Sequence, residues 1–291
     1  MAEDEVKLEL WKSRSINFHL TSRYPQVLSL VDTLLDEVIA HIKSRDNPKR
    51  IHTAKLKKSL SLLLLNLYSL HKVNRKKYVG YPRNPGGFER TRYKKHNVGF
   101  DVFKNVVDTL DELGYLESHL GYYIKEFGIG KNSRMRANLS LIELFKEHKL
   151  APVMVQREAV EEVIILKSVN ILEDNKKDKF VIDYEDTEQT NQMRANLQSI
   201  NALLDNRWID LNVSDKVYEK IAEETEKKKN RSDIDFNRKR LKRIFNNSSF
   251  EDGGRFYHGW WQEIPKGDRK NITIDGKRTV EVDYSSIHFR I

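Results

Sequence analysis

Residues 100–125 read FDVFKNVVDTLDELGYLESHLGYYIK, and this stretch decides the fold predicted for the first half of the chain. Apolar residues recur at helical spacing from Phe100 to Leu113, and Gly114 then occupies the position that commonly ends a helix. The following residues predict a short strand over 115–117, a turn at 119–121 and a second strand over 122–125. Another helix is expected over about 137–148.

The order helix, strand, turn, strand, helix is typical of a winged helix-turn-helix. Residues 110–123 (LDELGYLESHLGYY) resemble the junction between recognition helix and wing in many winged-helix DNA-binding domains. This resemblance covers about residues 50–150, and it implies that 100–113 is the recognition helix and 115–135 the wing. The alternative is a small α+β packing module that does not contact DNA.

A strongly basic stretch precedes this segment. From Lys72 to Lys95 the chain has nine lysines and arginines and a single glutamate, interleaved with tyrosine and phenylalanine. This composition favours binding to a polyanion, because each cation near a phosphate releases a condensed counterion. The alternative is a solvated charged loop. The candidate nucleic-acid contacts here are Arg75, Lys76, Lys77, Arg90, Arg92, Lys94 and Lys95.

Hydrophobic patterning divides the chain into four segments. Residues 1–50 form an N-terminal helical region, with a helix expected from Pro25 to about Asn47. Residues 51–150 form the winged-helix-like domain, which opens with a helix over about 52–70. Residues 151–215 form a connecting α/β region with strands over 162–167 and 180–184 and a helix from 186. Residues 216–291 begin with a helical pattern that extends to about 245, with a break at 227–231. The predicted fold class is α+β, mostly helical.

Composition excludes several classes of protein. The 291-residue chain has a mass of 34.3 kDa, a formal net charge of +9 and a mean hydropathy of −0.67. Its longest apolar run, 60–70, is much shorter than the ~20 residues that span a bilayer. Cysteine is absent, which excludes disulfides, thiolate metal sites and cysteine nucleophiles. We therefore expect a soluble, intracellular protein whose partner is nucleic acid and not a membrane.

The last fifty residues carry the most specific pattern. Gly253-Gly254-Arg255-Phe256 is followed by Gln262-Glu263-Ile264-Pro265, by Arg269, by a strand-like run over 272–274 and by an Asp-Gly turn at 275–276. The chain then reads TVEVDYSSIHFRI over 279–291. Residues 280–282 predict a strand with Asp283 at its C-terminal end, where a carboxylate can hold Mg²⁺.

This ordered set resembles the family A DNA polymerases, in which T-G-R, Q-N-I-P and a further arginine precede a motif A of the form D-Y-S-x-I-E-x-R. The resemblance implies that the segment is the start of a polymerase palm that binds two Mg²⁺ ions. It implies that Asp283 is a catalytic metal ligand, and that the backbone carbonyl of Tyr284 is a second ligand. The residues implied to contact the nucleotide or the primer–template duplex are His288, Arg290, Arg255, Gln262 and Arg269.

Two departures from the family pattern affect what the resemblance implies. His288 replaces the glutamate that excludes ribose in the family, so preference for deoxyribose does not carry over. The aromatic run over 256–261 replaces a polar linker, and its rings either stack on bases or form core.

The later family A motifs, with a second metal-binding aspartate, do not follow Arg290 in this sequence. We therefore expect an N-terminal fragment, a truncated reading frame or one half of a split protein, which needs a second chain to polymerise. The expected partner is DNA, with RNA as the alternative, in the cytoplasm of a bacterial or phage-infected cell. The competing hypothesis is a non-enzymatic winged-helix DNA-binding protein, either a replication initiator or a transcriptional regulator.

Overall fold

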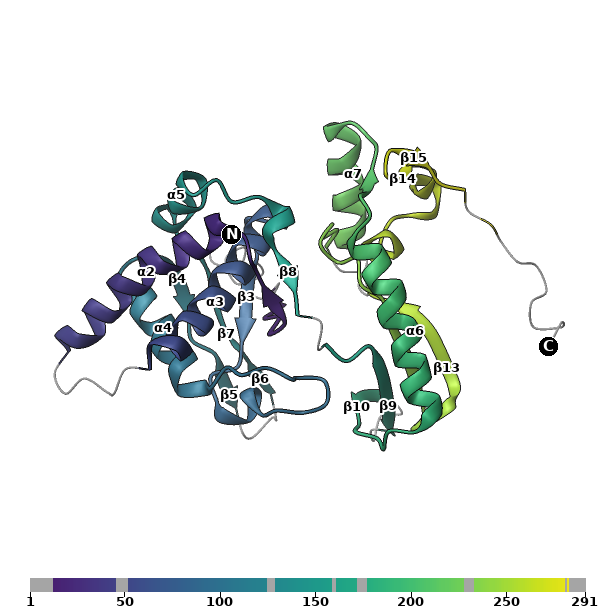
Figure 1. Cartoon of the computed structure of the whole chain (residues 1–291), viewed down its shortest axis with the longest axis horizontal. Coiled ribbons are helices and arrows are strands. Elements are labelled where there is room, and N and C mark those ends of the chain that lie inside the picture. The colour runs from purple at the N-terminus through teal and green to yellow at the C-terminus, as the bar shows by residue number, and fades with distance from the viewer. Residues whose placement is uncertain are drawn as a thin grey trace. The chain divides into compact units, whose positions relative to one another are not determined.

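The computed structural model describes residues 13–45, 52–124, 129–158, 161–171, 177–227, 233–280 and 282. The chain divides into two compact units, Met1–Glu162 and Val163–Ile291 (Figure 1). The fold is mixed α+β, as predicted. The four predicted segments are distributed over these two units: 1–50 and 51–150 share one core, and 151–215 is divided between the units.

The N-terminal unit packs helices against a four-stranded sheet of order β1-β3-β7-β4. The predicted helices near 25–47, 52–70, 100–113 and 137–148 are confirmed. The bounds of its elements are β1 Ser13–Ser15, β2 Leu20–Thr21, α2 Pro25–Ser44, α3 Thr53–Val73, β3 Tyr78–Tyr81, α4 Phe100–Glu112, β4 Leu116–His119, β5 Tyr122–Ile124, β6 Ile129–Lys131, β7 Ser133–Ala137, α5 Leu139–Glu147 and β8 Gln156–Arg157.

Helix α3 is the centre of this unit. Every residue from Leu62 to Leu70 is buried, so the helix is enclosed on all sides, and α2 and α4 both pack against it. Its buried amide, Asn66, is fully used: Nδ2 donates to the carbonyls of Leu62 and Asn17, and Oδ1 accepts from the Asn17 N–H at 2.8 Å. These bonds fix the chain between β1 and β2 on α3 without an unsatisfied polar atom.

Helix α4 ends as the sequence predicts. Gly114 has a φ of 79°, and the next residue, Tyr115, donates its N–H to the carbonyl of Leu110 at 2.9 Å. This left-handed C′ glycine closes the last turn and sends the chain directly into β4.

The predicted turn at His119-Leu120-Gly121 is wrong. β4 and β5 run in line outwards, and β6 and β7 return, with pairs His119↔Arg134 and Tyr122↔Lys131 on either side of Gly121. A Cβ at Gly121 would lie 2.2 Å from the carbonyl oxygen of Lys131. The glycine is therefore required for the close approach of two strands, and the hairpin extends to Ala137, beyond the predicted wing.

The C-terminal unit contains a four-stranded sheet of order β10-β9-β12-β13 and a three-stranded sheet of order β11-β14-β15. Strands predicted near 162–167 and 272–274 and the helix from 186 are confirmed, whereas the strand predicted over 180–184 lies over 177–181 and overlaps the prediction only at 180–181. The bounds are β9 Ile164–Ile171, β10 Lys177–Val181, α6 Glu188–Asp205, β11 Ile209–Leu211, α7 Asp215–Lys227, β12 Lys242–Asn246, β13 Ser249–Tyr257, β14 Ile272–Ile274 and β15 Lys277–Arg278.

Helix α6 covers one face of the larger sheet. It begins at a capping box in which Thr187 and Thr190 exchange side-chain and backbone hydrogen bonds. Its buried Asn201 exchanges two bonds with the backbone of Leu241, at 2.9 and 2.7 Å. This clamp holds the segment that leads into β12 against α6.

A second cluster of buried residues surrounds the smaller sheet. Trp260 is fully buried there, with Ile209, Ile264 and Ile272 in the same cluster, so this ring is core and does not stack on bases. The predicted turn between β14 and β15 is confirmed, because Asp275 and Gly276 both adopt positive φ, as a two-residue Asp-Gly hairpin requires.

Two expectations for the C-terminal third are wrong within the described residues. The helical pattern extending to about 245 ends at Lys227, and 242–246 is strand β12, which pairs with β9 and β13. Long-range pairing outweighs local helical spacing here. Val280 and Val282 are exposed and do not lie in a strand, while Glu281 between them is outside the described residues.

We predict that Gly121→Ala destabilises the N-terminal unit by about 1–3 kcal/mol, because the added methyl collides with backbone that cannot move without breaking the hairpin. The matched control is Gly86→Ala, where the nearest atom to a new Cβ is 3.5 Å away and φ is not positive. Urea unfolding of both variants measures the difference. Equal stability of Gly121→Ala and the wild type would contradict the close approach of the two strands at Gly121.

Candidate nucleic-acid interface

The predicted basic stretch does not form one surface. Arg75 and Lys76 are exposed in the turn that follows α3, where Asn74 Oδ1 accepts the N–H of Lys76 at 3.0 Å. Lys77 precedes β3 and is partly buried. These residues lie at the start of β3, whereas those at 90–95 follow its other end.

Two of the downstream cations have structural roles. Arg92 lies 3.6 Å from the buried carboxylate of Glu162, whose side chain is 0% exposed. Lys94 donates to the backbone carbonyl of Gly87 at 3.3 Å. Arg90 and Lys95 remain exposed on this loop. The sequence-predicted set therefore separates into residues that hold the loop and residues that face solvent.

A cleft of about 460 Å³ opens where the C-terminal end of α3 meets β3, the base of the β4–β7 hairpin and the start of α5. Its size is within the range of pockets that hold small ligands. The lining residues are Leu67, Leu70, His71, Arg75, Lys77, Val79, Glu117, Arg136, Ala137, Asn138, Leu139, Ile142 and Lys146.

The cleft is strongly cationic. Arg75, Lys77, Arg136 and Lys146 line it, and Glu117 is the one acidic residue of the lining. The Glu117 carboxylate accepts from Arg136 Nε at 2.7 Å and from the Tyr78 hydroxyl. Burial raises the pKa of Glu117, but the hydrogen bonds from Tyr78 and Arg136 outweigh it and lower the pKa overall. Within the described residues, neither Arg75 nor Lys146 forms an ion pair.

The positive charges around the cleft affect the pKa of His71. Burial lowers the pKa of His71, and the charges of Arg75, Lys72 and Lys146 lower it further. The neutral imidazole is therefore favoured at neutral pH. An anion bound in the cleft would oppose these charges and raise the pKa of His71.

Helix α5 turns one of its faces towards the cleft. Leu139, Ile142 and Lys146 have helical spacing and line the cleft, while Leu141 and Phe145 are buried in the core. Leu139 is 73% exposed at this position. Sequence reasoning missed Arg136, Lys146 and His71, and the one local signal was the exposed apolar and cationic face of α5.

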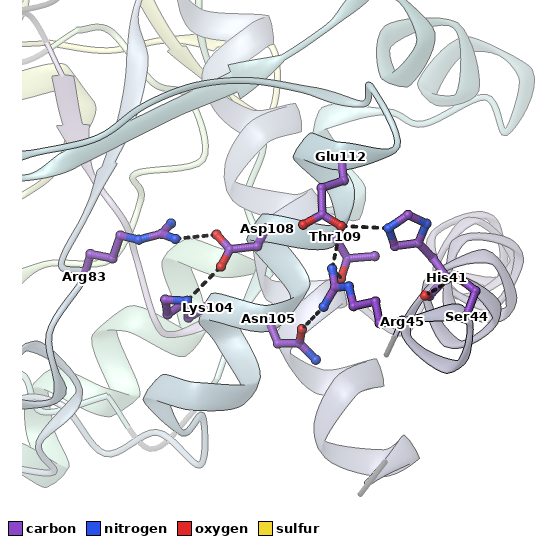
Figure 2. Close-up of polar contacts among 9 residues, drawn as sticks. All are labelled: His41, Ser44, Arg45, Arg83, Lys104, Asn105, Asp108, Thr109 and Glu112. Carbon is purple, nitrogen blue, oxygen red and sulfur yellow. Dashed lines mark hydrogen bonds and ion pairs between the residues drawn. The ribbon is translucent and has the colours of Figure 1, made fainter. Parts of the chain in front are cut away.

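The predicted recognition helix has its polar face occupied by other residues of this unit (Figure 2). Arg45, just after α2, donates to Asn105 Oδ1 at 2.7 Å, Thr109 Oγ1 at 2.9 Å and Glu112 Oε2 at 2.8 Å. His41 contacts the same Glu112 oxygen at 2.7 Å. Hydrogen bonds from His41 and Arg45 lower the pKa of Glu112, which keeps it ionised.

A second arginine, Arg83, pairs with another polar position of α4. Arg83 donates to Asp108 Oδ1 at 2.6 Å, and Lys104 donates to Asp108 Oδ2 at 2.9 Å (Figure 2). The remaining polar side chains of α4 include Asp101 and Asp111, which are exposed carboxylates. This face is acidic and internally hydrogen-bonded, so it is poorly suited to a DNA backbone.

The predicted contacts in the C-terminal unit differ in their roles. Arg255 is exposed on β13. Gln262 holds a turn, since its Nε2 donates to the Phe256 carbonyl at 2.8 Å and its Oε1 accepts from the Gly259 N–H at 3.1 Å. Arg269 Nε donates to the Ile264 carbonyl at 3.2 Å. Gln262 and Arg269 therefore support the fold locally.

The predicted metal and nucleotide ligands, Asp283, Tyr284, His288 and Arg290, lie outside the described residues. Among the residues that are described, no group of three or more histidine, aspartate or glutamate side chains is arranged to hold a metal ion. Mg²⁺ binding at Asp283 stays a prediction.

Comparisons of this chain with models of known protein families, with curated proteins and with solved structures find no match. The resemblances to winged-helix domains and to family A polymerases therefore stay predictions. In the described parts of the chain, no helix is both long enough and apolar enough to cross a membrane.

We predict that Lys146→Gln raises the pKa of His71, because it removes one of the charges that disfavour the imidazolium. The matched control is Lys149→Asn, which removes a charge just beyond α5 at a position of positive φ that asparagine tolerates. NMR titration of the His71 ring measures both. An unchanged pKa in Lys146→Gln would show that Lys146 does not face the cleft.

Proposed function

We propose that this protein binds DNA through the cationic cleft of its N-terminal unit, and that this unit is a winged-helix-like module. The observation that carries the proposal is the gathering of Arg75, Lys77, Arg136 and Lys146 around one cleft that contains a single, already hydrogen-bonded carboxylate. Such a site attracts phosphate groups and gains free energy from counterion release.

The cleft lining combines cations that can bind phosphate groups with apolar side chains that can contact a sugar or a base. Arg75 and Lys146 form no ion pair within the described residues and are available to donate to phosphate oxygens. Leu139 and Ile142 supply apolar surface for a sugar or a base edge. Phosphate contacts of this kind determine affinity and position more than sequence preference.

The hairpin supports the winged-helix-like assignment. It follows α4 directly, and β7 pairs with both β3 and β4, which builds a three-stranded platform beside the helix. The outer strand β5 presents the exposed rings of Tyr122 and Tyr123. Because Arg45 and Arg83 occupy the polar face of α4, we assign DNA contact to the cleft and hairpin and not to α4.

Removing two cleft charges tests the proposal. We expect the double variant Arg75→Gln, Lys146→Gln to bind a DNA duplex more weakly and to lower the slope of log K against log salt by about 2, at ~0.9 per phosphate contact. Fluorescence anisotropy at several salt concentrations measures this slope, and an RNA duplex tests the alternative partner.

The control removes the same charge elsewhere on the N-terminal unit, as Lys43→Gln, Lys55→Gln. Lys43 is exposed on α2, and Lys55 is exposed at the end of α3 opposite the cleft. The control should keep at least most of the wild-type slope. If the two double variants lose the same amount of slope, the effect depends only on net charge, and the assignment of DNA binding to the cleft is overturned.

We also propose that the C-terminal unit is the beginning of a family A polymerase-like palm that supports two-metal nucleotidyl transfer together with further palm and fingers residues. The ordered motifs from Gly254-Arg255 to Asp283-Tyr284-Ser285 carry this second proposal. In it Asp283 and the Tyr284 carbonyl bind Mg²⁺, and His288 and Arg290 contact the nucleotide.

The test of this second proposal is primer extension by the protein produced from its natural locus, so that any continuation or partner chain is present. We expect Mg²⁺-dependent extension that falls at least 100-fold in Asp283→Asn, while DNA affinity stays within twofold. Asp252→Asn, which alters an exposed carboxylate on β13, is the control. Absence of extension in the wild type, or equal activity of Asp283→Asn, would leave DNA binding as the function.

A further inference from the structure

Helix α6 packs against one face of the four-stranded sheet in the C-terminal unit, and among the described residues no hydrophobic cluster forms on the other face, although Ile165 is buried there. The pairings Ile244↔Ile165 and Ile244↔Arg255 place these three residues on one side of the sheet. The pairs Val181↔Lys167, Lys179↔Val169 and Lys242↔Tyr257 belong to the same side, because side chains two residues apart share a face. We call this side the open face.

The opposite side carries the core. Ile164, Leu166 and Phe245 lie there, and they form a buried cluster with Leu197 and Met193 of α6. Figure 1 shows α6 running along the sheet on this side. Helix α6 therefore packs against the face of the sheet opposite the open face. On the open face Lys179, Val181, Arg255 and Tyr257 are all exposed.

The open face has a distinct composition. At its paired positions with described side chains, the open face combines four cations and one aromatic ring with aliphatic side chains, and none of these positions holds a carboxylate: Ile165, Lys167, Val169, Ile171, Lys179, Val181, Lys242, Ile244, Arg255 and Tyr257. Within the described residues, Lys167, Lys179 and Arg255 form no ion pair. These three cations thus share one surface without an ion pair among the described residues.

The acidic residues of these strands lie outside the paired positions of this face, and Asp178, which pairs with Asn170, lies on the opposite side of the sheet. Glu251 and Asp252 lie on β13 beyond the irregular pairing at Phe245↔Gly253, towards the β12–β13 turn. Asp252 accepts a hydrogen bond from Asn247 Nδ2 at 3.1 Å in that turn. The bulge therefore separates the acidic end of the hairpin from Arg255 and Tyr257.

We propose that the open face of the β10-β9-β12-β13 sheet binds single-stranded nucleic acid. The cations contact phosphates, and Tyr257 stacks on a base, with Val169, Val181 and Ile244 as apolar support. A duplex presents mainly phosphates to such a flat surface, whereas a single strand also exposes the base faces that an aromatic and aliphatic patch can bind. This site is separate from the cleft of the N-terminal unit and goes beyond the proposed function.

The first test removes charge from the open face of the full chain. We expect Lys167→Gln, Lys179→Gln, Arg255→Gln to lower the salt slope for a 20-nucleotide oligothymidylate by about 2, at ~0.7 per phosphate contact on a single strand. The matched control, Lys216→Gln, Lys220→Gln, Lys227→Gln, removes three exposed charges from α7 in the same unit. Equal slopes in the two triple variants would overturn the proposal.

The second test isolates stacking and does not depend on the triple variant folding. Tyr257→Leu should weaken oligothymidylate binding by about fivefold or more, while Tyr257→Phe should stay within twofold of the wild type. Equal binding by the two variants would overturn stacking at Tyr257. The cleft variant Arg75→Gln, Lys146→Gln distinguishes the two sites. If this variant loses duplex binding, adding Tyr257→Leu to it should still weaken its binding to the oligothymidylate.

Discussion

Burial of α3 on all sides is the constraint on which the N-terminal unit depends. A helix that is apolar around its circumference must be enclosed, so α2, α4 and the sheet pack against it. Two of its buried polar side chains are hydrogen-bonded, since Asn66 bonds to the backbone of Leu62 and Asn17 and the Tyr68 hydroxyl donates to the Leu150 carbonyl. Cations collect where the chain leaves the buried helix, at Arg75 and Lys77, and β7 and α5 bring Arg136 and Lys146 to the same place. The position of the cleft follows from this packing.

The C-terminal unit follows a different rule. Its sheet joins two distant segments through the parallel pairing of β9 with β12, and α6 is clamped to this arrangement by the bonds between Asn201 and Leu241. One helix covers only one face. The other face keeps lysine and arginine side chains instead of the alternating charges that a merely solvated surface commonly carries. The two units thus each present a cationic surface, although their folds are unrelated.

Local patterns predicted local structure well. Helical spacing located α2, α3, α4 and α5, Gly114 marked the end of α4, and the Asp-Gly pair at 275–276 marked the turn of a hairpin. Features that depend on tertiary contacts were missed or misread. Gly121 suggested a turn but permits close strand approach, and β12 has a helical pattern but is held in the sheet by β9. The cleft was not predictable, because its cations come from three separate segments, the turn between α3 and β3, strand β7 and helix α5.

The same distinction applies to charge. A basic stretch in sequence suggested one surface, yet Arg92 pairs with Glu162 and Lys94 binds a backbone carbonyl, so only part of the stretch faces solvent. The most direct test of two nucleic-acid surfaces is hydrogen exchange of the full chain with and without a duplex that carries a single-stranded tail. Our account predicts protection at 71–77, at 136–146 and along β13, with α4 and α7 unchanged. Protection confined to α4, or none in either unit, would contradict it.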